Sequence, residues 1–289
     1  MVLKKSQLFA LGFSLIASLS LEQGQASDFH SPRSLALGGS GHAGPILNDA
    51  IYLNPSYAPF LKTYSVSASY LSFNDTHQSN PGRAYGISIH DGRTKLFQAG
   101  LGYSVRESGA LFTVGASKSF LERFGFGMGA KMFFPNTQAE TSFQDISLSS
   151  TFVAANWLHF ALIADNLIQS DTALRRGMAR EIVLGSKINF EGIFVLYLDP
   201  HYAPTVDPSE RWGYEMGAEW GIMSDLYLRA GLFSNSQIPY QEQRGGGFGF
   251  GAGWMAPKLS LDYGFSRVLA TSTNAPTSNI HTFGATVYF

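Results

Sequence analysis

Alternation of apolar residues with small or polar ones is the feature that most constrains the fold of this chain. The last predicted strand shows this pattern. One of its faces carries Phe283, Ala285, Val287 and Phe289, and the other carries Thr282, Gly284 and Thr286. A period of two is that of a β-strand, whose successive side chains point to opposite faces of a sheet. Because such segments recur back to about Tyr64, the chain is predicted to be all-β.

The first residues have the layout of a secretory signal peptide. Lys4 and Lys5 precede an apolar run over residues 8–21, and the small residues Gly24 and Ala26 follow. We expect cleavage after Ala26, which makes residues 1–26 the signal peptide. A membrane anchor is the less favoured alternative, because the run is shorter than the roughly 20 apolar residues of a spanning helix.

Low charge favours a lipid-facing barrel over a soluble secreted sandwich, which shares the alternation but needs more charge on its water-facing sides. Charged residues make up 14% of the chain, against about 25% in ordinary soluble domains. With the export signal, this predicts a transmembrane antiparallel β-barrel that contacts outer-membrane lipid.

The chain has no cysteine, which excludes disulfides and thiolate metal sites. Its net charge of −1 gives no preference for nucleic acid.

The alternating segments predict about fourteen strands in residues 64–289. Their expected ranges are 64–74, 83–90, 95–106, 109–119, 123–134, 144–154, 157–165, 180–190, 192–199, 212–221, 225–234, 246–255, 258–267 and 280–289. Connections after odd-numbered strands are mostly long and polar, and those after even-numbered strands are short. Short turns lie on the periplasmic side of outer-membrane barrels, so we expect both ends of the mature chain there.

Residues 27–63 do not alternate. They contain the run Gly38-Gly39-Ser40-Gly41, Pro45, the pair Asn54-Pro55 and Pro59, a composition typical of turns and short helical pieces. A barrel of fourteen strands is wider than one that side chains alone can fill. We therefore expect residues 27–63 to form an N-terminal hatch inside the barrel.

The same region resembles a known family. The matching pieces are Arg33, the run Ala36-Leu37-Gly38-Gly39-Ser40-Gly41-His42-Ala43, then Asn48-Asp49-Ala50 and Leu53-Asn54-Pro55. They look like the hatch of the FadL long-chain fatty-acid transporter superfamily, and more like its PorV/PorQ-like branch. The resemblance implies fourteen strands and a hatch. Ser56 departs from the alanine that is usual after the NP pair, and this chain is much shorter than typical FadL transporters.

Two sets of candidate site residues follow. The hatch candidates are Gly38, Gly39, Asn48, Asp49, Asn54 and Pro55, with proline fixing a turn and asparagine capping backbone groups. A hatch that shifts when ligand binds is the less favoured alternative for the Asn-Pro pair. By the alternation, Lys131, Glu219, Arg229 and Asp262 point into the lumen, with Glu181, Lys187 and Asp199 as further candidates.

The lumen residues have two interpretations. Because charges of both signs are present, a buried salt-bridge network is favoured over a polar constriction or a site for a ligand head group. The glycine run over residues 245–251 lacks the Lys-Ser/Thr and helix of a phosphate loop. We expect it to let the hatch backbone approach the strand closely or to let the wall bend.

Catalysis is disfavoured, since the seven histidines are scattered without metal-ligand spacing and no Gly-x-Ser-x-Gly occurs. We expect no enzyme, cofactor or metal, although side chains on separate strands could still assemble a lipase site.

The favoured function is a FadL-like conduit for hydrophobic or amphipathic small molecules. The alternative is a PorV-like docking or shuttle protein with a protein partner. Phe289 is expected to act as the assembly signal that the barrel assembly machinery recognises.

Overall fold

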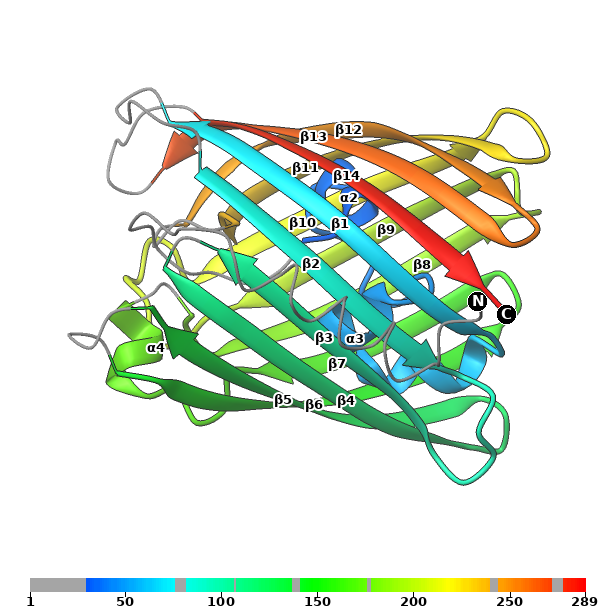
Figure 1. Ribbon diagram of the computed structural model, residues 1–289, viewed down its shortest axis with the longest axis horizontal. Coiled ribbons are helices and arrows are strands. Elements are labelled where there is room, and N and C mark those ends of the chain that lie inside the picture. The colour runs from blue at the N-terminus through cyan, green and yellow to red at the C-terminus, as the bar shows by residue number, and fades with distance from the viewer. Residues whose placement is uncertain are drawn as a thin grey trace, which may run out of the picture.

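The computed structural model describes residues 30–75, 82–106, 108–136, 141–175, 178–239, 244–271 and 278–289. In these ranges fourteen antiparallel strands form a closed barrel in which neighbours in sequence pair (Figure 1). The strands are β1 (Tyr64–Asp75), β2 (Gly82–Asp91), β3 (Gln98–Arg106), β4 (Gly109–Phe120), β5 (Phe124–Pro135), β6 (Phe143–Ala155), β7 (Leu158–Asp165), β8 (Glu181–Phe190), β9 (Phe194–Tyr202), β10 (Trp212–Gly221), β11 (Leu226–Gln237), β12 (Arg244–Ala256), β13 (Leu259–Thr271) and β14 (Ser278–Tyr288). The predicted fold class is confirmed. The predicted signal peptide and its cleavage site lie outside the described residues.

The first and last strands close the barrel. β14 pairs with β1 in a register that runs from Ser65↔Tyr288 to Asp75↔Ser278. Beyond this ladder, the backbone N–H of Phe289 donates to the carbonyl of Tyr64 at 2.9 Å. Closure pairs both edges of the sheet, which satisfies backbone groups that an open edge would expose.

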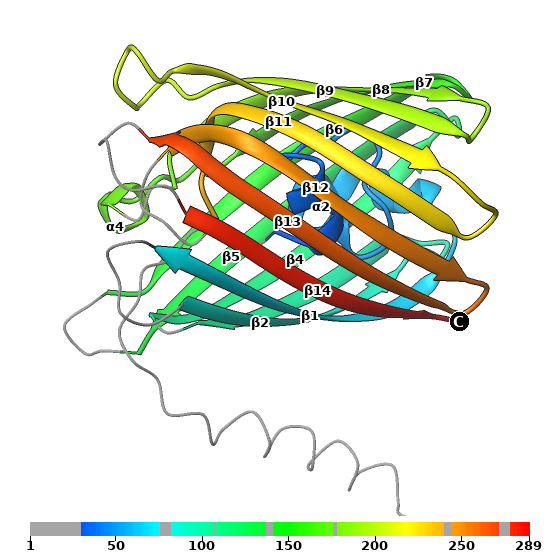
Figure 2. The same cartoon turned by 90° about the horizontal axis from the view of Figure 1, so that it is seen from above.

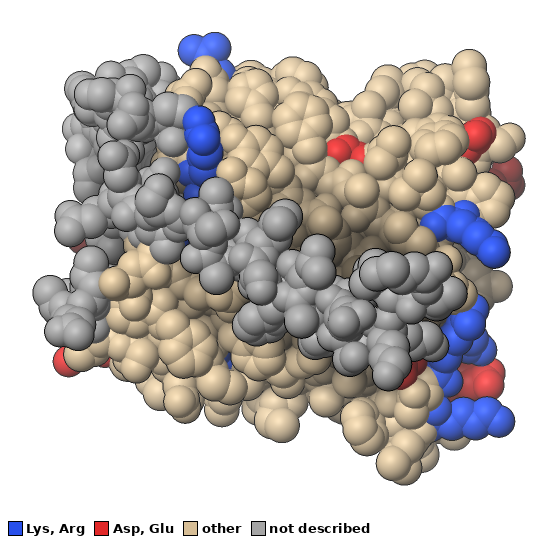
Figure 3. All heavy atoms as spheres, in the orientation of Figure 1, with Lys and Arg blue, Asp and Glu red and all other residues tan. Residues whose placement is uncertain are grey.

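The two faces of the strands differ as the alternation predicts. Outward side chains are apolar and strongly exposed, for example Phe283 at 52% and Leu232 at 56%, whereas inward residues of the same two strands, such as Thr282 and Arg229, are buried. On the side shown in Figure 3, Lys and Arg gather toward the two ends of the barrel. An apolar band between charged ends is what a bilayer requires of a spanning barrel.

Three strands run a few residues past their predicted ends: β9 to Tyr202, β11 to Gln237 and β13 to Thr271. Pairing shifts register between Phe233 and Ser236 in β11, and at Gly246 and Gly247 in β12. A β-bulge changes which face the next residue occupies, so the sequence pattern breaks although the ladder continues.

The longer connections lie at the end of the barrel opposite to the C-terminus, and one of them carries helix α4 (Asp171–Arg175) (Figure 1). The connections at the C-terminal end are short, as at residues 121–123, 156–157 and 257–258. We call these the loop end and the turn end. The connection between β3 and β4 is short although it lies at the loop end.

Residues 30–63, the interior segment, lie inside the barrel (Figure 2). They form α2 (Pro32–Ala36), α3 (Asp49–Leu53) and the 3-10 helix η1 (Pro55–Phe60). α2 packs against β11–β14, whereas η1 packs against β3–β6 on the other side. The segment therefore crosses the lumen and contacts both walls. None of the described helices has the length and apolar character to cross a membrane.

Candidate functional site

Glycines in the wall allow the interior segment to approach the strands at backbone distance. A Cβ at Gly231 would lie 2.0 Å from the carbonyl carbon of Leu37, and one at Gly249 would lie 2.3 Å from the carbonyl oxygen of Leu35. Any side chain at these positions would collide with backbone, which has little room to retreat. This agrees with the steric interpretation of the glycine run that contains Gly249.

Gly38 and Gly39 form the turn that follows α2. Their φ angles of +68° and +92° are unfavourable for residues with a side chain. Gly39 also lies directly against the carboxylate of Glu215, which a Cβ would approach to 2.7 Å. The two predicted hatch glycines thus meet both a conformational and a steric requirement.

Arg33 in α2 joins the interior segment to the wall through an ion-pair network. Its Nε donates to Glu219 Oε2 at 3.1 Å and its Nη2 donates to the Tyr197 hydroxyl at 2.7 Å. Glu219 also accepts from Arg229 Nε at 2.6 Å, and Arg229 Nη1 donates to Asp262 Oδ1 at 2.6 Å. Three of the predicted lumen residues therefore lie together, paired with an arginine from the segment.

Asp49 in α3 lies at the edge of this network, with its Oδ2 4.0 Å from Arg33 Nη1. Burial raises the pKa of Asp49 to about 6, although the nearby Arg33 opposes the shift. Burial alone would lower the pKa of Arg33, but the combined attraction of Glu219, Tyr197 and Asp49 outweighs it and raises that pKa. The network therefore holds a permanent cation beside a carboxyl group that titrates near neutral pH.

Lys131 lies apart from the other predicted lumen residues. Its Nζ donates to Asp165 Oδ2 at 2.6 Å. Of the further candidates, Glu181 pairs with Arg244 at the loop end, and Lys187 Nζ lies 5.8 Å from the ring centroid of Tyr57. Lys131 and Glu181 are thus paired with residues of opposite charge, which supports the salt-bridge interpretation for these two positions.

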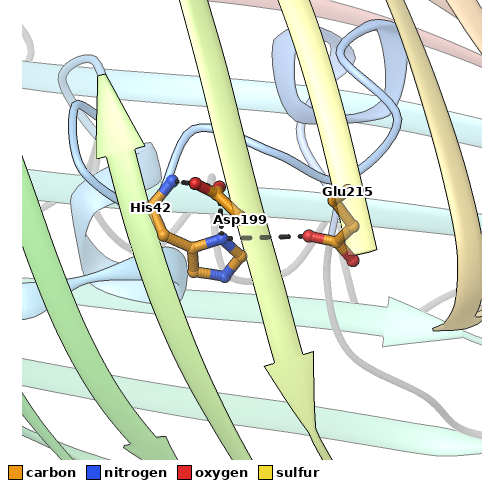
Figure 4. Close-up of side chains that lie close together, drawn as sticks. All are labelled: His42, Asp199 and Glu215. Carbon is orange, nitrogen blue, oxygen red and sulfur yellow. Dashed lines mark hydrogen bonds and ion pairs between the residues drawn. The ribbon is translucent and has the colours of Figure 1, made fainter. Parts of the chain in front are cut away.

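His42, Asp199 and Glu215 form a second polar cluster (Figure 4). Asp199 Oδ2 accepts from the backbone N–H groups of Gly41 and His42 at 2.7 and 3.0 Å, and lies 3.0 Å from His42 Nδ1. Glu215 Oε2 lies 3.8 Å from the same Nδ1. Although burial lowers the pKa of His42, its hydrogen bond to Asp199 and the surrounding carboxylates raise that pKa to about 9.

This cluster corrects the view that the histidines are scattered. They are scattered in sequence, but the fold brings His42 to two carboxylates on neighbouring strands. The alternation placed Asp199 on the inward face. It contained no information on where a residue of the interior segment would come to rest.

Asn54 and Pro55 define the turn between α3 and η1. Pro55 is the first residue of η1, and Asn54 Oδ1 accepts from the backbone N–H of Ser56 at 3.1 Å. Asn54 Nδ2 donates to the carbonyl of His42 at 2.7 Å and to Thr151 Oγ1 in β6 at 2.9 Å. Asn54 therefore connects two parts of the segment with the wall.

Ser56 adds a contact that the sequence did not indicate. Its hydroxyl donates to Asn54 Oδ1 at 2.5 Å and lies 2.7 Å from Thr151 Oγ1. Alanine, the usual residue of the resembling family, would have neither contact. On the opposite side of the segment, Asn48 donates to Ser88 and accepts from Ser65.

Two small interior cavities lie on opposite sides of the segment. The cavity toward the loop end has a volume of about 60 Å³, and its walls include His42, Lys131 and Glu215. The cavity toward the turn end has a volume of about 40 Å³, and its walls include Arg33 and Asp262. The two share no lining residue, so the segment separates them.

A third hollow lies on the outer surface. It has a volume of about 660 Å³ and is lined mainly by apolar residues of β1, β12, β13 and β14, such as Tyr70, Trp254 and Phe283. Figure 3 shows a depression among uncharged side chains on this side of the barrel. In a bilayer it would face acyl chains.

No protein-family model matches the sequence, and no curated protein is similar to it in sequence. Solved structures do share the fold. The CymD monoaromatic hydrocarbon channel is 11% identical with a TM-score of 0.67, over 94% of this chain and 99% of that one. The toluene transporter TodX of Pseudomonas putida is 10% identical with a TM-score of 0.62, over 92% and 99%. A Pseudomonas aeruginosa FadL homologue is 11% identical with a TM-score of 0.59, over 91% and 99%.

Proposed function

We propose that the protein is an outer-membrane barrel of FadL type that conducts small hydrophobic or amphipathic molecules passively, with residues 27–63 as its hatch. The observation that carries this proposal is the interior segment, which separates a cavity at the loop end from one at the turn end. A solute crossing the barrel must displace the segment or pass beside it. Side-chain hydrogen bonds and ion pairs, which water can replace, contribute much of its attachment to the wall.

The solved structures with the same fold suggest the class of solute. They are described as channels or transporters of monoaromatic hydrocarbons and toluene. Identity near one tenth carries only the fold to this chain, and fold alone does not determine a substrate. The apolar outer face and the location that we propose make membrane-soluble compounds the reasonable first test set.

Uptake of labelled toluene by intact cells tests this function. Cells that express the full chain should accumulate toluene faster than cells that express an equal amount of an unrelated outer-membrane barrel. Equal rates would contradict the conduit.

Protease digestion of the same cells tests the orientation of the barrel. Cleavage is expected within residues 166–175, and preferential cleavage at the turn 191–192 would mean that the barrel has the opposite orientation.

A docking function remains the second candidate, and the filled lumen favours it. The interior cavities of about 60 and 40 Å³ are smaller than the roughly 150 Å³ of a cavity known to hold benzene. A barrel of this kind would serve a secretion or envelope assembly through a protein partner. Native mass spectrometry after gentle extraction separates the two functions, because a conduit should retain a hydrophobic adduct and a docking protein should retain a second chain.

A further inference from the structure

The His42–Asp199–Glu215 cluster has the composition of a metal site. It combines one imidazole with two carboxylates, and one ligand atom from each residue lies within 4.8 Å of the others. The imidazole comes from the interior segment, and the carboxylates come from the adjacent strands β9 and β10 (Figure 4). Three side chains from three separate elements therefore converge on one point.

The charges around this point are unbalanced. Glu181, a further carboxylate at the loop end, is paired with Arg244 and also lies 3.6 Å from His201 Nε2. Among the ion pairs of the described residues, this leaves Asp199 and Glu215 with His42. Asp199 is satisfied by backbone N–H groups, but Glu215 contacts only the His42 ring among the polar groups of the described residues. Its side chain is 13% exposed, and a carboxylate buried to this extent requires a stronger counter-charge than one shared imidazole.

We propose that His42 Nδ1, Asp199 and Glu215 bind a divalent transition-metal ion such as Zn²⁺. A doubly charged ion would neutralise the two carboxylates. The imidazole selects for zinc and related metals over Ca²⁺ and Mg²⁺, which prefer oxygen ligands. The separations of 3.0 and 3.8 Å between His42 Nδ1 and the two carboxylates bracket the roughly 3.3 Å edge of a tetrahedral site with bonds of about 2.0 Å.

The site borders a cavity that leaves room for further ligands. His42 and Glu215 line the cavity at the loop end, which has a volume of about 60 Å³. A cavity of this size holds a few water molecules, which can complete the coordination of the metal. On binding, the imidazole must give up the proton on Nδ1, and that proton passes to the buffer.

A bound ion would connect the segment to two strands. His42 belongs to the segment, so the metal would lock it against β9 and β10 at the end where a solute enters. The metal site goes beyond the proposed function. The site can be present whether or not the barrel conducts solutes. A negative uptake measurement would therefore contradict only the conduit, and a negative metal titration would contradict only the metal site.

Calorimetric titration of the purified, folded chain with Zn²⁺, after removal of metal by chelation, tests the site. One ion per chain is expected to bind, with proton release that changes the heat between buffers of different ionisation enthalpy. Glu215→Gln and His42→Gln should each weaken zinc binding by roughly 100-fold. Removing a residue that only hydrogen-bonds to a metal ligand already costs up to about this much, and these two residues are ligands themselves. His281→Gln is the matched control, because His281 contacts Tyr263 in the β13–β14 wall, and its affinity should not change.

The outcomes divide clearly. Absence of stoichiometric binding, or binding that survives both ligand substitutions, would overturn the proposal. If either variant fails to fold, a second experiment is used, in which crystals of the unaltered protein are soaked in ZnCl₂. Anomalous density between His42, Asp199 and Glu215 would support the site, and an ion bound only elsewhere would refute it.

Discussion

At the scale of single residues, Gly231 sets how closely the segment can approach the wall. Gly231→Ala would place a Cβ 2.0 Å from the Leu37 carbonyl carbon. The segment must shift, and we expect stability to fall by about 1–3 kcal/mol, as for other overpacked sites. Thermal midpoints of the folded barrel in detergent measure the change. Gly221→Ala is the control, since its nearest neighbour lies at 3.6 Å; equal midpoints for the two variants would show that the contact is not tight.

The titration of Asp49 makes a prediction about pH. Its pKa in the folded barrel is raised to about 6 from 3.8, chiefly by burial, so folding favours the protonated acid. The resulting stability is fully present below pH 3.8 and is lost as pH rises through 6, by about 3 kcal/mol in all. Between pH 4 and pH 7 the unfolding midpoint of the unaltered chain should therefore fall more than that of Asp49→Asn. Parallel curves would contradict this assignment.

At residue scale the sequence predicted the direction of side chains better than their partners. Alternation placed Glu219, Arg229 and Asp262 on the inward face, and the structure adds that Arg33 completes their network. Arg33 and His42 belong to a segment without strand periodicity. Their positions depend on tertiary packing, which no local pattern encodes.

At the scale of elements, α2 is held against β10 and β11 by charge. Glu219 lies between two buried arginines, and Glu219→Gln would leave both short of negative charge. Removal of one member of a buried ion pair costs about 3–5 kcal/mol, so α2 should detach more readily. Trypsin reports this directly, because the bond after Arg33 is protected while Arg33 is buried; cleavage there should accelerate.

The matched substitution for this experiment is Glu122→Gln. Glu122 lies in an exposed turn between β4 and β5. Its substitution by glutamine changes the net charge of the chain by the same amount as Glu219→Gln, but leaves the ion-pair network intact. Cleavage after Arg33 at the same rate in both variants would mean that the network does not hold α2. The two variants thereby separate a local effect of the ion pairs from a general effect of charge.

At the scale of the whole molecule, the barrel could be predicted from sequence because each strand reports its own faces. Fourteen repetitions of one local rule, with turn lengths that alternate, specify a closed sheet and leave little freedom in topology. The fully extended ends of β11 and β13 were missed because bulges interrupt the alternation there. The path of residues 30–63 was beyond reach for a different reason, since it follows gaps that glycines leave in opposite walls.

Whether this path opens is a property of the whole molecule, and a pair of cysteines can test it. The hydroxyls of Ser56 in η1 and Thr151 in β6 lie 2.7 Å apart, so Ser56→Cys with Thr151→Cys should form a disulfide without large movement. The chain has no cysteine of its own, so this bond would be the only one formed. If solutes pass by displacement of the segment, oxidation should abolish toluene uptake and reduction should restore it.

A second pair shows whether cross-linking alone disturbs the barrel. Ser67 and Thr286 face each other at 3.0 Å across β1 and β14, so Ser67→Cys with Thr286→Cys would join two wall strands and leave the segment free. Uptake should then be the same with and without oxidant. If the 56–151 disulfide also leaves uptake unchanged, solute passes without movement of η1 away from β6. Loss of uptake in the 56–151 pair alone would identify the interior segment as the moving part.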